Sequence, residues 1–218
     1  MNGTDRDTVA TTDLSAYRDN LRTMMGIIGP SVKLLAVVKG NAYGHGIVEC
    51  ARTAIDTGAA MLGVAYGMEG IRLRDEGIDA PILVMGAETE EFVPDAVARG
   101  LTIGTPSAET LSAVKKAVRA TGKSARIHVK VDAGMGRIGV RPDDAEALIR
   151  DALGSPGIVV EGIYTHFPSA DEDRDPQSFA QIDTFTALLD RLAAGGIRPP
   201  VAHMCNSAAT IRFPRARL

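Results

Sequence analysis

The sequence has no tryptophan, only two cysteines and few aromatic residues of any kind. Aromatic residues make up 4% of the 218 residues, whereas hydrophobic residues as a whole make up 45%. The core must therefore be built mainly from Val, Ile, Leu, Ala and Met, which suits a buried parallel sheet covered by helices. Cys50 and Cys205 lie far apart and in no C-x-x-C spacing, which argues against a disulfide framework and favours a reducing, cytoplasmic compartment.

Long apolar runs and a strong charge excess are also lacking. No run approaches the length of a transmembrane helix, and residues 1–12 form a polar tail without the apolar centre of a secretory signal. The formal net charge of −3 gives no reason to expect nucleic acid or an anionic membrane as a partner. These absences indicate a soluble globular protein.

Short apolar runs alternate with helical patterns along most of the chain. A first helix is predicted from Asp13, a good N-cap, to the Gly29-Pro30 pair. Seven strands are predicted at 34–39, 61–65, 81–86, 101–104, 126–132, 158–165 and 201–205, and six intervening helices at 47–57, 67–76, 90–99, 107–121, 143–153 and 177–194. A repeating strand–helix order implies parallel strands joined by right-handed crossovers.

Two α/β architectures fit this order, an open doubly wound sheet and a closed (β/α)8 barrel. Polar side chains follow four of the predicted strands, namely Lys39, residues 132–137, His166 and the pair Asn206-Ser207. Barrels place active-site residues at the carboxyl ends of many strands, whereas open sheets concentrate them at one switch point. The pattern favours a TIM-type (β/α)8 barrel, incomplete because about seven strands are present.

Lys39 is the first candidate for chemistry, because it ends a buried strand in the stretch LLAVVKGNAYGHG at 34–46. A strand-end lysine often extends its ammonium group into water and has no further role. However, an amine partly desolvated by Val37 and Val38 loses its proton more readily and can then attack an aldehyde. Lys39 is therefore a candidate nucleophile.

The residues after Lys39 indicate which aldehyde. Three glycines permit a tight turn and let backbone amides approach a ligand: Gly40, Gly44 and Gly46. The next helix is predicted to begin near Ile47, where its N-terminus suits a phosphate, and the Tyr43 hydroxyl can reach the same group. An aldehyde-reactive lysine beside a phosphate site is what pyridoxal 5′-phosphate requires.

Four stretches, in order and at suitable spacing, resemble signatures of the alanine racemase family. They are AVVKGNAYGHG at 36–46, HVKVDAGMGRIGV at 128–140, GIYTHFPSADE at 162–172 and CNSAATIRFP at 205–214. The family more often has A-D or A-N than the G-N found after the lysine here. The resemblance implies that residues 13–218 are the N-terminal pyridoxal-phosphate-binding barrel domain of such an enzyme.

The resemblance also implies roles for individual residues. Lys39 would hold the cofactor as an imine and act as the base on one face of the substrate carbon. Tyr43 and Ser207 would bind the cofactor phosphate, and Asn206 would belong to the same cofactor-binding segment. Arg137 would contact the phenolic oxygen of the cofactor and orient the substrate carboxylate.

Two further residues receive roles in the same way. His166 would lie near the pyridine ring and help position an arginine that contacts the ring nitrogen. Lys130 matches a lysine that is carboxylated in some family members and steadies Arg137. No metal is implied.

The implied function is the interconversion of L-alanine and D-alanine for peptidoglycan synthesis by a cytoplasmic homodimer. The resemblance implies that an eighth strand and a β-rich C-terminal domain with a second catalytic tyrosine should follow these residues, so we expect the chain alone to have little activity. Three alternatives remain on the same barrel: a serine or broad-specificity racemase, a decarboxylase, or a non-catalytic pyridoxal-phosphate-binding protein.

Other patterns suggest sites that we do not expect to find. GMGRIG at 134–139 fits the G-x-G-x-x-G pattern of a dinucleotide site, but the next helix is predicted to start at Pro142 and not within the motif. His203 and Cys205 lack a complete set of metal ligands and are assigned to packing. His128 is assigned to a buried strand with its hydrogen bonds satisfied.

Overall fold

The computed structural model describes residues 9–172 and 176–218 and contains one sheet of seven parallel strands. The strands are β1 (Leu35–Val37), β2 (Met61–Val64), β3 (Ile82–Val84), β4 (Thr102–Thr105), β5 (Ala125–Lys130), β6 (Ile158–Tyr164) and β7 (Val201–His203). Each strand pairs with the next one along the chain, so the sheet order is the chain order.

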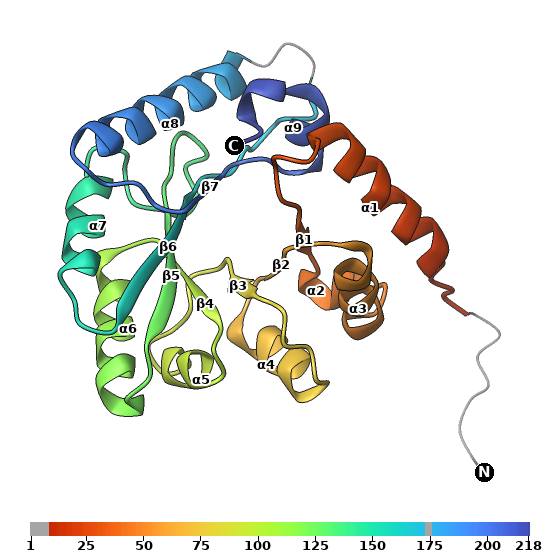
Figure 1. Cartoon of the computed structure of the whole chain (residues 1–218), viewed down its shortest axis with the longest axis horizontal. Helices are drawn as coiled ribbons and strands as arrows, with labels where there is room; N and C mark the ends of the chain where they lie inside the picture. The colour runs from red at the N-terminus through yellow and green to blue at the C-terminus, as the bar shows by residue number, and fades with distance from the viewer. Residues whose placement is uncertain (1–8, 173–175) are drawn as a thin grey trace.

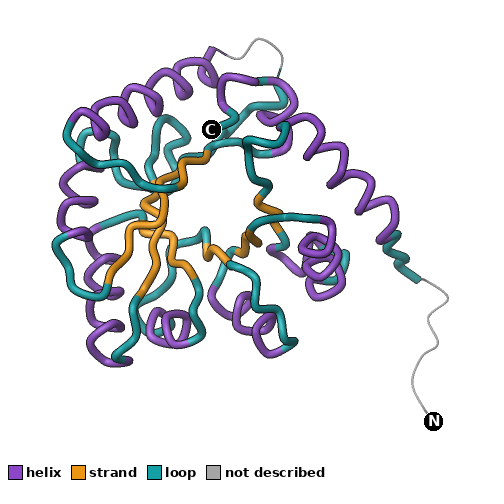
Figure 2. Tube along the Cα trace, viewed as in Figure 1, coloured by secondary structure: helices purple, strands orange, loops and turns teal. Residues whose placement is uncertain are grey.

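Helices surround the curled sheet on its outer side, and the strands form the inner ring (Figures 1 and 2). The helices are α1 (Leu14–Ile28), α3 (Ile47–Thr57), α4 (Gly67–Asp75), α5 (Val93–Ala98), α6 (Ala108–Thr121), α7 (Ala145–Leu153), α8 (Pro176–Ala194) and α9 (Ser207–Arg212). The predicted incomplete barrel of seven strands is therefore confirmed. None of the helices in residues 9–172 and 176–218 is both long and apolar enough to cross a membrane.

Local signals in the sequence set the ends of the first helix. Asp13 Oδ1 accepts hydrogen bonds from the amides of Ser15 and Ala16, at 2.9 and 3.0 Å, and so begins α1 as predicted. Gly29, with φ of 73°, ends the helix. Residues 1–8 of the predicted polar tail lie outside the described part of the chain. Near the other end of this tail, the Thr12 hydroxyl donates a hydrogen bond to the carbonyl oxygen of His45 at 3.0 Å.

Over residues 9–172 and 176–218, the ring is not closed by strand pairing. Within the described residues β1 and β7 are the two edge strands of the sheet. The segment after β7 lies against α1 (Figure 1), and the Arg217 guanidinium donates to the carbonyl oxygen of Ile27 in α1 at 3.0 Å and to that of Thr210 in α9 at 2.8 Å. Arg217 therefore ties the last helix to the first.

Two strand glycines make room for large side chains inside the ring. The Tyr164 hydroxyl on β6 donates to the carbonyl oxygen of Met85, just after β3, at 2.9 Å, so this side chain crosses the interior. A Cβ atom on Gly104 would lie 2.7 Å from that hydroxyl, and one on Gly162 would lie 2.7 Å from the His128 ring. Neither site has space for a larger residue.

Candidate active site at the carboxyl ends of the strands

Lys39 follows β1 and begins a short left-handed helical turn, α2 (Lys39–Tyr43). The φ angles are 62° at Gly40, 55° at Asn41, 53° at Ala42 and 56° at Tyr43. For residues other than glycine, this conformation costs roughly 1–2 kcal/mol each. The sequence predicted a tight glycine turn here, but intrinsic preferences gave no reason to expect three consecutive non-glycine residues in it.

Hydrogen bonds within the turn and from Asn41 stabilise this conformation. The amide of Ala42 donates to the carbonyl oxygen of Val38 at 2.8 Å. The Asn41 side-chain oxygen accepts from the amide of Ile47, the first residue of α3, at 3.1 Å. The start of this helix was predicted to suit a phosphate, but its first amide is already bound by Asn41, so the predicted phosphate site has one donor fewer.

Lys130 at the end of β5 is a buried amine among other cations. Its side chain is 5% exposed, and its Nζ lies 4.4 Å from the centroid of the Tyr164 ring. The pKa of Lys130 is lowered to about 8, chiefly by burial and also by the nearby Arg137 and Lys39 cations, while Asp132 acts in the opposite direction. Residues at or just after the ends of β1, β5 and β6 thus meet at one end of the barrel.

His166, after β6, belongs to the same group. Burial lowers the pKa of His166 to about 4, with smaller contributions from the Lys130, Arg137 and Lys39 cations. The imidazole is therefore neutral near pH 7. The basic side chains of Lys39, Lys130 and Arg137 around a neutral imidazole make a site that favours an anionic ligand such as a phosphate or a carboxylate.

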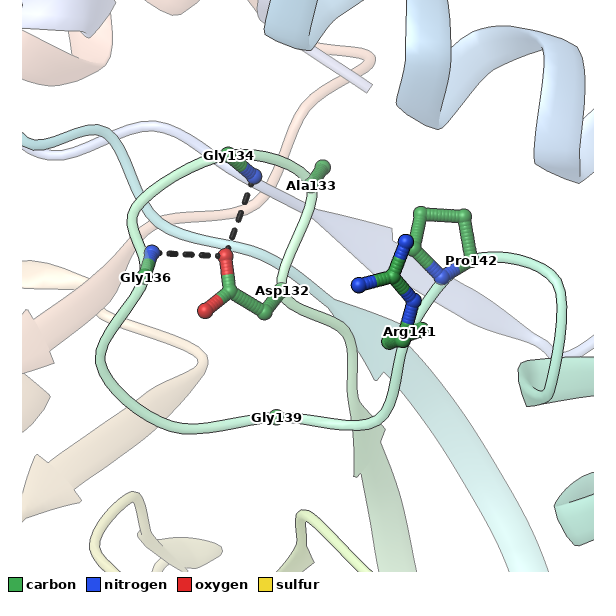
Figure 3. Close-up of a pocket in the computed structure, with 7 residues that line it drawn as sticks. All are labelled: Asp132, Ala133, Gly134, Gly136, Gly139, Arg141 and Pro142. Carbon is green, nitrogen blue, oxygen red and sulfur yellow. Dashed lines mark hydrogen bonds between the residues drawn. The ribbon is translucent and has the colours of Figure 1, made fainter.

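The loop after β5 is built around the carboxylate of Asp132 (Figure 3). One carboxylate oxygen accepts from the amides of Gly134 and Gly136, each at 3.0 Å, and the other accepts from the amide of Arg137 at 2.9 Å. Burial raises the pKa of Asp132, but these backbone hydrogen bonds more than offset that effect, and the net pKa is lowered. Asp132 therefore fixes the backbone from which Arg137 extends.

This loop is not a dinucleotide site. Its amides face Asp132, and Val131 and Val140 form a parallel bridge that closes it. A Cβ atom on Gly139 would lie 2.5 Å from the amide nitrogen of Asp132, so the third glycine of GMGRIG serves this close approach. Helix α7 begins only at Ala145, three residues later than Pro142, where its start was predicted. The hollow beside the loop is bordered by Arg141 and Pro142 (Figure 3).

Asn206 and Ser207 follow β7 and begin α9, a helix that was not predicted. The Asn206 side-chain oxygen accepts from the amide of Ala209 at 2.9 Å, so Asn206 is the N-cap of this helix. The run Asn-Ser-Ala-Ala-Thr carries that signal in the sequence. Ser207 is exposed at the first helical position.

Lys39, Lys130, Arg137 and His166 are thus brought within electrostatic reach of one another. Tyr43 lies beside them, with its ring centroid 6.0 Å from the Lys39 Nζ. The hydrogen bonds of Asn206 stay within its own helix, so its part in binding a cofactor, like that of Ser207, stays a prediction.

Two histidines, His128 (fully buried) and His203 (partly buried), form a pair that the sequence did not predict. His128 Nδ1 lies 3.0 Å from His203 Nε2, and the Tyr164 ring stacks on the His203 ring with centroids 4.8 Å apart. The other nitrogen of His128 lies 3.3 Å from a Glu161 carboxylate oxygen, without the alignment of a hydrogen bond. The earlier assignment of His203 to packing was therefore incomplete. Only the register of β5, β6 and β7 brings these residues together, which no local signal could have predicted.

Comparison with known proteins identifies the same family. Residues 12–218 match the model for the alanine racemase N-terminal domain. Alanine racemase 1 of Oceanobacillus iheyensis is 42% identical over 210 residues, which cover 96% of this chain and 56% of that protein, and the alanine racemase of Symbiobacterium thermophilum is 41% identical over 97% of this chain and 56% of that protein. The chain thus spans little more than half the length of these relatives.

Solved structures agree with the sequence matches. An alanine racemase of Clostridium difficile superposes with a TM-score of 0.92 and 33% identity, covering 98% of this chain and 57% of that one. The alanine racemase of Bacillus anthracis, solved with bound L-Ala-P, has a TM-score of 0.89 and 36% identity, covering 97% of this chain and 55% of that one. This chain belongs to the alanine racemase N-terminal domain family.

Proposed function

We propose that this chain is the pyridoxal 5′-phosphate-binding part of an alanine racemase, which interconverts L-alanine and D-alanine. The observation that carries the proposal is the placement of Lys39 in a constrained turn at the carboxyl end of β1, beside Lys130, Arg137 and His166. Relatives that carry the name alanine racemase, and one solved with bound L-Ala-P, support alanine as the substrate. A cytoplasmic homodimer supplying D-alanine for peptidoglycan is the setting that we propose for the longer protein.

The residues present fit this cofactor chemically. The primary amine of Lys39 suits the aldehyde, the Arg137 guanidinium suits the phenolic oxygen, and the Tyr43 hydroxyl suits the phosphate. Burial raises the pKa of Tyr43, so its hydroxyl keeps its proton and can donate to a phosphate oxygen. When bound, the cofactor supplies the delocalisation that makes removal of an amino acid's α-proton possible.

Residues of this chain would then bind the charged group of the substrate and transfer one proton. Lys39 Nζ would take the α-proton on one face and return it there. Arg137, whose backbone is fixed by Asp132, would bind the substrate carboxylate and orient the α-carbon. His166 is uncharged near pH 7, so its imidazole can donate or accept a hydrogen bond without adding a further positive charge to the site.

Racemisation needs a second acid–base group on the opposite face of the α-carbon, because one lysine cannot serve both faces. We propose that this group, and the groups that complete the substrate pocket, come from the longer protein or from a second subunit. We therefore expect residues 1–218 alone to racemise alanine slowly or not at all. Assays of the longer protein with alanine and with serine would separate the two substrates.

Mapping the reactive lysine tests the cofactor site directly. Pyridoxal phosphate is added to the protein, borohydride is used to make its attachment permanent, and the modified peptide is identified by mass. Label at Lys39 is expected, with its loss in Lys39→Ala and its retention in Lys33→Ala, an exposed lysine just before β1. Label mainly at another lysine, for instance Lys130, would refute the assignment.

A further inference from the structure

Glu69, in the first turn of α4, binds backbone groups of two different loops. Its Oε2 accepts from the amides of Ala65 and Tyr66, at 2.8 and 3.4 Å, which caps the start of its own helix. Its Oε1 accepts from the amide of Gly40 at 2.6 Å, across 29 residues of sequence. Gly40 is the residue directly after Lys39.

The hydrogen bond from the Gly40 amide to Glu69 lies at the start of the strained left-handed turn. Gly40 is the first residue with positive φ in the left-handed turn, and Asn41, Ala42 and Tyr43 continue it at a conformational cost. Hydrogen bonds from an amide to a carboxylate are roughly twice as strong as those between neutral groups. Because Glu69 is also anchored at the end of β2, it fixes the end of β1 relative to the neighbouring strand.

We propose that Glu69 is a positioning residue for Lys39: it holds the Gly40 amide so that the Lys39 amine stays where the cofactor aldehyde binds. The inference rests on the proposed function. It also goes beyond helix capping, which needs only the bonds to Ala65 and Tyr66 and would leave the reactivity of Lys39 unaffected.

Two variants separate the capping role from the positioning role. In Glu69→Gln, the side chain keeps its length and still suits a capping position, but it has one acceptor oxygen in place of two. It therefore cannot satisfy both loops. Glu69→Ala removes all three bonds. Amide hydrogen exchange at Gly40 and at Ala65 reports which bond each variant has lost.

Glu88 supplies a matched control. Its carboxylate accepts from the amides of Gly67, at the start of α4, and Thr89, at 3.3 Å for the latter. Glu88 thus stabilises a neighbouring loop through the same kind of carboxylate–amide hydrogen bond, but it does not bind Gly40. Glu88→Gln should perturb α4 locally and leave Lys39 in place.

The experiment compares the rate of borohydride trapping at Lys39 after addition of pyridoxal phosphate, with Lys33 labelling in the same sample as an internal reference. We expect the Lys39-to-Lys33 ratio to fall roughly tenfold in Glu69→Ala, as the loss of a charge-assisted hydrogen bond predicts, and to fall in Glu69→Gln wherever Gly40 exchange is accelerated. Glu88→Gln should keep the ratio of the unsubstituted protein. General loosening of the fold would instead raise the labelling of both lysines.

Three outcomes would overturn the inference. An unchanged ratio in Glu69→Ala, or in a Glu69→Gln protein with accelerated Gly40 exchange, would show that Lys39 does not depend on Glu69. An equal fall in Glu88→Gln would show only a general effect of loop bracing. Absence of Lys39 label in the unsubstituted protein would remove the proposed function and this inference together, and so is distinguishable from the first two.

Discussion

At the residue scale, the interior of this barrel is distinguished by buried polar side chains. His128, Lys130 and Tyr164 are all buried, and the Tyr164 ring contacts both of the others from a neighbouring strand, where an ordinary barrel core would carry branched apolar residues. Strand glycines provide the space for them, and the histidine pair and the stacked tyrosine fill it.

Gly162→Ala should destabilise the protein by about 1–3 kcal/mol, because the new Cβ would lie 2.7 Å from the His128 ring, which is itself fully buried. Gly26→Ala is the matched control, since a Cβ in that position of α1 has no neighbour within 4 Å. It should stabilise by roughly 0.5–1 kcal/mol. Urea denaturation measures both. Equal effects of the two substitutions would contradict the packing described for Gly162.

His203 should make stability fall in acid. Burial lowers its pKa to about 3 from an ordinary value of 6.5, with smaller contributions from His128 and Lys130. Between these pH values the unfolded chain binds a proton that the folded chain does not. The free energy of unfolding therefore falls as the pH falls through this window, by at most about 1.4 kcal/mol per pH unit for this one group.

The slope of that dependence is the quantity to measure. Urea denaturation at several pH values between 7 and 4 is expected to show a shallower slope in His203→Gln than in the unsubstituted protein. The difference in slope isolates His203 from the other groups that titrate in acid. Equal slopes in the two proteins would mean that protonation of His203 does not lower the free energy of unfolding.

At the scale of elements, the left-handed turn of α2 is the feature that most shapes the site. It reverses the chain between the end of β1 and the start of α3, and it places Lys39 and Tyr43 near each other. The Asn41 side chain links the turn to α3 through the amide of Ile47. Asparagine also tolerates left-handed φ better than most residues.

Asn41→Ala should therefore destabilise the protein by about 1–2 kcal/mol, because it removes the hydrogen bond from the first amide of α3 and adds strain to the turn. Asn41→Asp keeps a side-chain oxygen in the same place and should retain most of the stability. Thermal denaturation of the three proteins checks the order. If Asn41→Asp were as unstable as Asn41→Ala, the hydrogen bond between residue 41 and Ile47 would not be the source of the effect.

At the scale of the whole molecule, the contact between α9 and α1 is what spans the opening between β7 and β1. Arg217 makes it with hydrogen bonds to carbonyl oxygens of Ile27 and Thr210. Both edge strands otherwise present unpaired backbone groups, which favour association with other chains. Loss of this contact is thus expected to affect both stability and solubility.

Arg217→Ala should lower the free energy of unfolding by about 1–3 kcal/mol and increase concentration-dependent association. Arg215→Ala is the control: Arg215 pairs with Asp183 at 2.8 Å, but both side chains are more than 60% exposed, so its loss should change stability by less than about 1 kcal/mol. Denaturation and sedimentation velocity measure the two effects. If both variants lost the same amount of stability, Arg217 would contribute no more to the free energy of unfolding than an exposed ion pair does.

The sequence by itself determined the alternation of strands and helices, the N-cap at Asp13, and the positions of Lys39, Arg137 and His166 after predicted strands. Each of these depends on residues close together in the chain, through periodicity, capping and turn chemistry. The start of α9 at Asn206 carried the same kind of signal and could have been found.

Only the tertiary structure decided the left-handed conformation after Lys39, the pairing of His128 with His203, and the contact of Glu69 with Gly40. Local preferences argue against the first, and the other two join residues 75 and 29 positions apart. Strand register and the packing of neighbouring loops set such contacts, and both depend on the whole fold at once.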